Sequence, residues 1–65
     1  MITTTKFDVA VACADFASLL DNAKNEFPSD EEKAGASRLV EELHDLAECL
    51  AGDRAGEIYA AVDKL

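Results

Sequence analysis

The sequence has few of the residues from which catalytic and metal sites are built. It contains one histidine, two cysteines and no tryptophan. A metal site needs several ligands that converge on one point, and His44 has no second histidine or cysteine three or four residues away. A nucleophilic site needs a serine or cysteine beside a base, and no serine is spaced to meet His44. We therefore expect no enzymatic activity, no metal and no cofactor. His44 is expected to contact Glu48 on a solvated helix face.

Long apolar segments and glycine-rich loops are also missing. The longest uninterrupted apolar run, Val9 to Ala14, is far shorter than the ~20 residues of a membrane-spanning helix. No basic segment followed by an apolar one opens the sequence, and the glycines form no phosphate-binding loop. We expect a cytoplasmic protein, in which Cys13 and Cys49 are reduced thiols that act as small hydrophobic side chains.

Basic residues are scarce relative to acidic ones. Six lysines and arginines stand against 14 aspartates and glutamates, which gives a formal net charge of −8. A chain with this charge repels phosphates, so it is expected to bind neither nucleic acid directly nor an anionic membrane surface. A protein partner with a basic surface is compatible with the charge. The alternative is that the acidic residues serve only solubility.

The 65 residues are expected to form one small acidic domain, residues 1–65. A chain of this length buries only about 60% of its unfolded surface, so a core of its own is marginal. Hydrophobic residues make up 49% of the sequence, but many of them are alanine, which contributes little buried area. The shortage of large apolar residues predicts a homodimer, in which a second chain completes the core.

The segment Phe27 to Glu32 predicts a turn between two helices. Pro28 lacks a backbone N–H and disfavours helical geometry at the preceding residue, so a helix should end there. Ser29 is a favourable N-cap, and Glu32 stands at the position that completes a capping box. The predicted fold is therefore all-α: a helical hairpin around Pro28 plus a shorter third helix, forming a small bundle that dimerisation completes.

Apolar residues at helical spacing predict the extent of each helix. The first helix should run from about Thr5, with Asp8 as a capping partner, to Glu26. The second should run from about Asp30 to Ala51, and the third from about Arg54 to Lys64. The predicted core consists of large residues on these stripes: Phe16, Leu20, Leu39, Leu43, Leu46, Leu50, Ile58 and Val62.

Two alternatives to this assignment remain open. Phe7, Val9, Val11 and Cys13 alternate along the chain as they would on a half-buried strand. A nearly continuous apolar stripe also connects the second and third helices, so they could form one helix with a bend at Gly52.

The placement of the acidic residues gives the candidate binding site. Glu41, Asp45 and Glu48 lie on one stripe of the second helix, and Glu42 flanks it. Like charges at this spacing destabilise a helix by a few tenths of a kcal/mol per pair, and Glu48 opposes the helix dipole. Because this arrangement costs helix stability, we expect these four residues to contact a partner, with an ordinary solvated face as the alternative.

In size, acidity and helical content the chain resembles the small anti-defence proteins of phages, which include anti-CRISPR and anti-restriction proteins that mimic DNA. The resemblance is one of overall character and rests on no shared motif. It implies an inhibitor whose acidic face blocks a basic, nucleic-acid-binding surface of a protein partner. The alternative is a helical adaptor or regulatory homodimer that binds a protein through an apolar groove.

Overall fold

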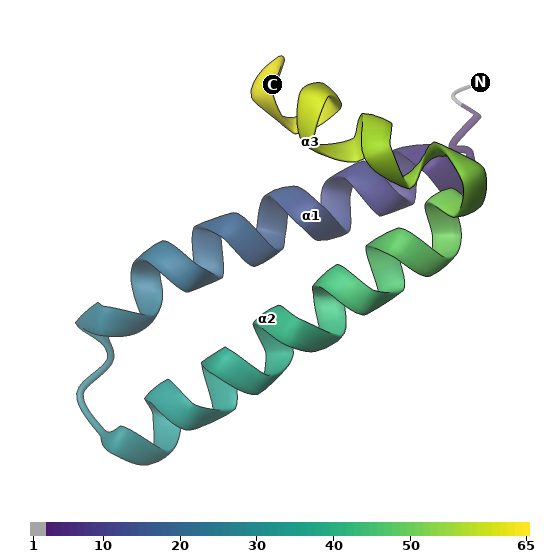
Figure 1. Ribbon diagram of the computed structural model, residues 1–65. Coiled ribbons are helices and arrows are strands. Elements are labelled where there is room, and N and C mark those ends of the chain that lie inside the picture. The colour runs from purple at the N-terminus through teal and green to yellow at the C-terminus, as the bar shows by residue number, and fades with distance from the viewer. Residues whose placement is uncertain (1–2) are drawn as a thin grey trace.

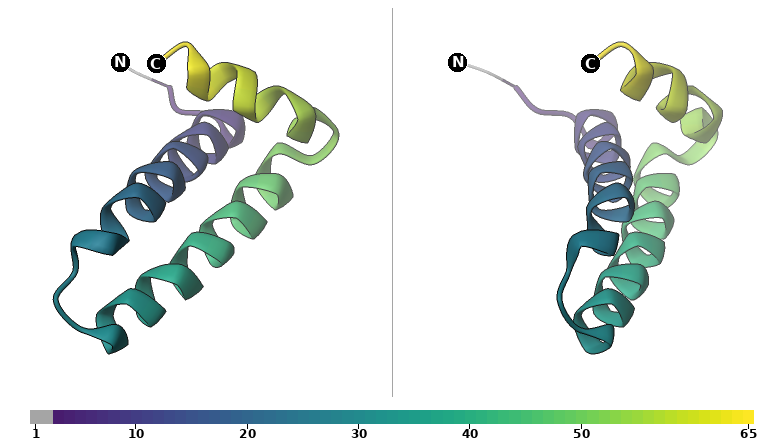
Figure 2. Two further views of the ribbon diagram at one scale, coloured as in Figure 1. Left: turned by 60° about the vertical axis from the view of Figure 1, so that its left-hand side comes forward. Right: turned by 90° about the vertical axis from the view of Figure 1, so that its left-hand side faces the viewer.

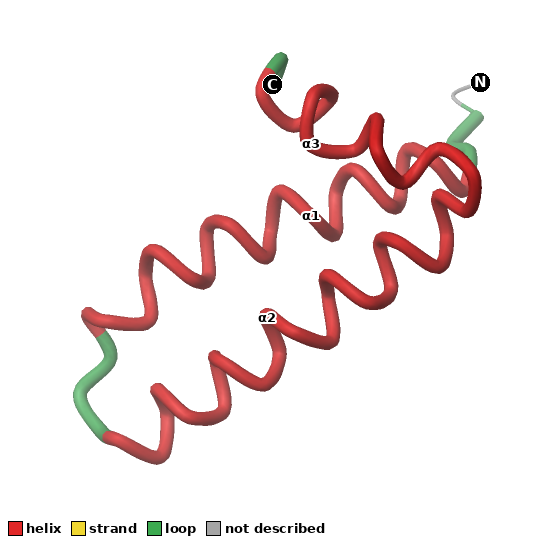
Figure 3. The backbone as a smooth tube through the Cα atoms, in the orientation of Figure 1, coloured by secondary structure: helices red, strands yellow, loops and turns green. Residues whose placement is uncertain are grey.

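A computed structural model describes residues 3–65, and over this range the chain is helical with no strand. The elements are α1 (Lys6–Ala23), the 3₁₀ turn η1 (Lys24–Glu26), α2 (Asp30–Ala51), the 3₁₀ turn η2 (Gly52–Arg54) and α3 (Ala55–Asp63). The all-α prediction is confirmed (Figure 3). The strand alternative is wrong, because Phe7 and Cys13 both lie within α1.

The two long helices lie side by side and antiparallel (Figure 1). We call them the helix pair. The short α3 crosses the end of the pair that lies away from the turn, as both views in Figure 2 show. It packs mainly against α1 and also against α2. The molecule is elongated, with extents of 39 × 22 × 21 Å.

Side-chain caps fix where the long helices begin. Thr5 accepts a hydrogen bond from the Asp8 backbone N–H, and the Asp8 carboxylate accepts one from the Thr5 N–H, which completes the capping box. Ser29 likewise accepts from the Glu32 backbone N–H. The Ser29 hydroxyl also donates a hydrogen bond to the Glu32 carboxylate at 3.2 Å. In this second cap the carboxylate therefore accepts from the side chain of the N-cap residue, whereas in the first it accepts from the backbone N–H.

Gly52 redirects the chain between α2 and α3. Its φ of 57° lies in the left-handed region, which glycine adopts without a steric penalty. The chain stays helical from α2 through η2 into α3, but the direction of the helix axis changes at Gly52 (Figure 1).

Alanine dominates the interior. The buried side chains are those of Ala10, Ala14, Ala17, Ala36, Val40, Ala47 and Ile58. Ile58 is the largest of them, and it brings α3 into contact with Ala10, Ala14 and Ala47. Small side chains between two helices allow their backbones to approach closely. We call the line of buried residues between α1 and α2 the alanine seam.

Of the predicted core, Ile58 is fully buried, and the half-buried Leu50 and Val62 pack against the core cluster around it. Leu20 and Leu43 are also half-buried. Phe16, Leu39 and Leu46 were expected inside and are 50%, 42% and 46% exposed. The reason is that alanines and Val40 occupy the positions of α1 and α2 that face each other, so these three larger side chains lie to the side of the seam.

The packing of the seam predicts that substitutions at Ala47 and at its neighbour Leu46 change the stability of the fold by different amounts. Ala47→Leu should lower the free energy of unfolding by about 1–3 kcal/mol, because the added atoms must force the closely packed helices apart. Leu46→Ala should cost less than about 1 kcal/mol, because Leu46 is 46% exposed. Urea unfolding of the two variants measures both. Equal stability of Ala47→Leu and the wild type would contradict the tight seam.

The first cap predicts a pH dependence. The Thr5 backbone N–H donates to the Asp8 carboxylate at 3.0 Å and lowers the Asp8 pKa below its ordinary 3.8. Because this pKa is lower in the folded than in the unfolded chain, the cap stabilises the fold above the unfolded pKa. Its contribution is lost as the pH falls through the folded pKa.

Asp8→Asn should therefore melt below the wild type at neutral pH, and the difference should vanish in acid. Thermal melts at a series of pH values measure it. Asp45→Asn is the matched control, since it removes the same charge from a residue outside the cap. A difference between Asp8→Asn and the wild type that stays constant with pH would contradict the assignment.

Candidate protein-binding surface

Large apolar side chains lie on the outside of the helix pair. Val9 and Phe16 of α1 are 42% and 50% exposed, and Leu39 and Leu46 of α2 have similar exposure. Residues seven apart lie on the same side of a helix, and each of these two pairs has that spacing. Together with the half-buried Leu20, these four residues make up what we call the apolar face.

The apolar face lies on the side of the helix pair opposite α3. Phe7 is on the α3 side of the pair, since it packs against the core cluster that includes Ile58 of α3, and the guanidinium of Arg54 in η2 lies 3.8 Å from the centre of its ring. Phe16 is nine residues further along α1, which is about two and a half turns and so the other side of the helix. On α2, His44 contacts Tyr59 of α3, whereas Leu46 is two residues away and so points elsewhere. No element among residues 3–65 covers this face.

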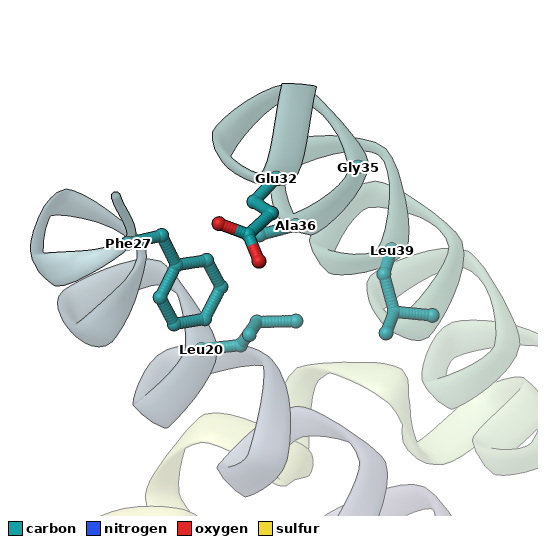
Figure 4. A pocket seen from close by; sticks show the side chains of 6 residues that line it. All are labelled: Leu20, Phe27, Glu32, Gly35, Ala36 and Leu39. Carbon is teal, nitrogen blue, oxygen red and sulfur yellow. The ribbon is translucent and has the colours of Figure 1, made fainter. Parts of the chain in front are cut away.

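A hollow of about 320 Å³ opens in the apolar face near the turn. Leu20, Phe27 and Leu39 supply its apolar walls, and Gly35 and Ala36 form part of its floor. Figure 4 shows the Phe27 ring and the Leu20 and Leu39 side chains around the opening, with the Glu32 carboxylate reaching over it. The Ser29 hydroxyl holds that carboxylate through the hydrogen bond described above.

Carboxylates border the apolar face on α2. Glu42 stands three residues after Leu39 and four before Leu46, so it is a neighbour of both on the helix surface. Glu32 stands at the hollow. Neither residue belongs to an ion pair among residues 3–65, where the ion pairs are Asp21–Lys24 and Arg54–Glu57.

The predicted partner-binding residues divide into two groups. Glu41, Asp45 and Glu48 lie on one stripe of α2 that points away from α1, and all three are exposed. Over the described part of the chain, none of them forms an ion pair. Glu42 is also exposed, and it lies between this stripe and the apolar face, three residues before Asp45 and four before Leu46. All four residues are thus exposed on neighbouring parts of the α2 surface.

Other polar groups do not form a site. His44 is half-buried, and its Nδ1 lies 3.5 Å from the Tyr59 hydroxyl, so the expected contact with Glu48 is replaced by one with α3. Cys13 and Cys49 have free thiols; Cys13 packs against the core, whereas Cys49 is exposed. No cluster of potential metal ligands occurs among residues 3–65. Within the same residues, no helix combines the length and apolar character that crossing a membrane requires.

Comparisons with known proteins identify no relative. The chain matches no protein-family model, no curated protein and no solved structure.

Proposed function

We propose that the chain is a small protein-binding module that holds a basic, amphipathic helix of its partner against the apolar face. One observation carries this proposal: of the seven large apolar side chains exposed in residues 3–65, four lie together on one side of the helix pair while alanines fill its interior. Such a distribution costs solubility and contributes little to the fold. Exposed apolar patches of this kind mark binding surfaces, and an amphipathic helix is the usual occupant of a helical groove.

Charge favours a basic occupant. The chain carries a net charge of −8, and Glu32 and Glu42 border the apolar face without ion-pair partners among residues 3–65. Lysines or arginines beside the apolar stripe of a partner helix would complement both. The predicted homodimer is a competing occupant of the same face. We disfavour it because two chains of this charge repel each other as they associate.

The affinity expected of this face is modest. Full burial of a large apolar side chain is worth about 1.5–3 kcal/mol, and these residues are already half-buried. After the cost of association, five such residues support a complex in the micromolar range.

Synthetic helices test the proposal directly. The probe is a peptide of leucine and lysine, about 15 residues long, with leucines on one helical face. Titration calorimetry should show micromolar binding with a negative heat-capacity change, the marker of apolar burial. A twin with glutamate in place of lysine should bind much more weakly, and a scrambled peptide of the same composition should not bind.

Matched variants locate the binding surface. Leu46→Ala should weaken binding of the leucine–lysine peptide about tenfold. Leu65→Ala removes an equally large, exposed side chain outside the apolar face, so it should have no effect. The proposal fails if none of the peptides binds. It also fails if light scattering shows a dimer that Leu46→Ala dissociates, because the second copy would then be the occupant.

The acidic stripe supports a second candidate function, inhibition by charge mimicry. Glu41, Asp45 and Glu48 are exposed and unpaired within residues 3–65. Successive carboxylates on this stripe are about 4.5–6 Å apart along the helix, a spacing similar in scale to that of phosphates on a nucleic-acid strand. Such a face could occupy a basic, nucleic-acid-binding surface of a partner.

A basic helical peptide without large apolar residues distinguishes binding by the acidic stripe from binding by the apolar face. The probe is a peptide of lysine and alanine. If the stripe binds, the affinity should fall steeply with salt, and exchanging the three acidic residues for lysine should abolish binding. The exchange should leave the fold intact or stabilise it, because like-charge pairs are relieved.

The control for the triple exchange changes the net charge equally at other exposed positions: Glu31, Asp53 and Asp63, each replaced by lysine. If this control weakens binding as much as the exchange on the stripe, overall charge and not the stripe governs recognition. Binding that survives the stripe exchange leaves the acidic face with a solubility role only.

A further inference from the structure

The fold gives no reason for a glycine at position 35 of α2. It lies within the helix, where glycine destabilises relative to alanine. Neither a turn nor a close contact requires it: its φ is not positive, and nothing lies within 4 Å of the position that a Cβ would occupy. A local choice that costs stability without a structural reason is typical of a functional position.

Gly35 is one of the residues that line the hollow. Gly35 stands three residues after Glu32 and four before Leu39, so the three residues share one side of α2. All three line the hollow, together with Leu20 and Phe27 from the other side of the turn. Gly35 is exposed, and a Cβ there would meet no atom of the protein within 4 Å, so a larger side chain has open space at this edge of the hollow.

We propose that this hollow is the anchor pocket of the apolar face, which takes one bulky apolar side chain of the basic partner helix. The inference rests on the proposed function and adds the point at which the partner is held most tightly. Apolar walls on three sides fit a leucine or phenylalanine side chain. Burial of one such side chain in a pocket commonly dominates the affinity of an interface.

The Glu32 carboxylate determines which kind of residue the partner helix carries beside its anchor side chain. It reaches over the hollow (Figure 4), and the hydrogen bond from the Ser29 hydroxyl fixes it there. A lysine or arginine one helical turn from the anchor side chain meets this carboxylate. The pocket therefore recognises an apolar residue and a basic residue together, which a purely apolar or an acidic helix does not present.

Substitutions at Gly35 test the anchor with the leucine–lysine peptide. Gly35→Ala should raise the melting temperature, because it improves helix propensity and its Cβ meets no other atom. Gly35→Leu should fill the hollow and weaken binding about tenfold to a hundredfold. Ala34→Leu adds the same side chain one position away, on an exposed part of α2 off the apolar face, and should bind as the wild type does.

A second pair of variants tests the charge at the pocket. Glu32→Gln keeps the shape and the hydrogen-bond acceptor for Ser29 but removes the charge. It should weaken binding of the leucine–lysine peptide several-fold and reduce its salt dependence. Glu31→Gln removes the same charge from the same helical turn, outside the hollow, and should change binding little.

The binding results distinguish failure of the anchor pocket from failure of the proposed function. If the peptide binds the wild type, loses affinity with Leu46→Ala and binds Gly35→Leu unchanged, the apolar face is used and the anchor pocket is wrong. If the peptide does not bind the wild type, the proposed function itself fails. Loss of affinity in a folded Gly35→Leu, with none in Ala34→Leu, supports the anchor.

Discussion

Alanine methyl groups fill the seam between α1 and α2, and these small side chains set how closely the two helix backbones approach. The other features follow from that approach. Larger side chains such as Phe16 and Leu46 have no space in the seam and lie beside it, where they are about half exposed. α3 covers one side of the pair through Ile58. The other side stays open and becomes the apolar face on which the proposed function depends.

The helices themselves could be predicted well from the sequence, because their signals are local. The extent of α2, Asp30–Ala51, matches the prediction at both ends, since Ser29 caps one end and Gly52 redirects the chain at the other. The Thr5–Asp8 capping box was also recognisable from spacing alone. Each of these features depends on residues within four positions of one another.

The core and the binding surface could not be predicted in the same way. Two apolar stripes run along each long helix, one of alanines and one of larger residues. Periodicity alone does not say which stripe meets the partner helix. Ranking stripes by residue size chose Phe16, Leu39 and Leu46 for the interior, whereas the stripes rich in alanine are the ones that are buried. Ala10, Ala14 and Ala17, which are four and three residues apart as on one side of a helix, were the available signal. Of the predicted site residues, Glu42 also borders the apolar face, a role that could not be recognised while Leu39 and Leu46 were expected in the core.

Solvent accessibility of individual methyl groups, measured by nuclear magnetic resonance with a soluble paramagnetic agent, tests the alanine seam most directly. The methyl signals of Leu39 and Leu46 should broaden strongly as the agent is added, because both side chains are more than 40% exposed. Those of Ala10 and Ala47 should remain sharp, because both are at most 2% exposed. Protected leucine methyls beside broadened alanine methyls would contradict the account, since α1 and α2 would then pack through their large residues and no apolar face would exist.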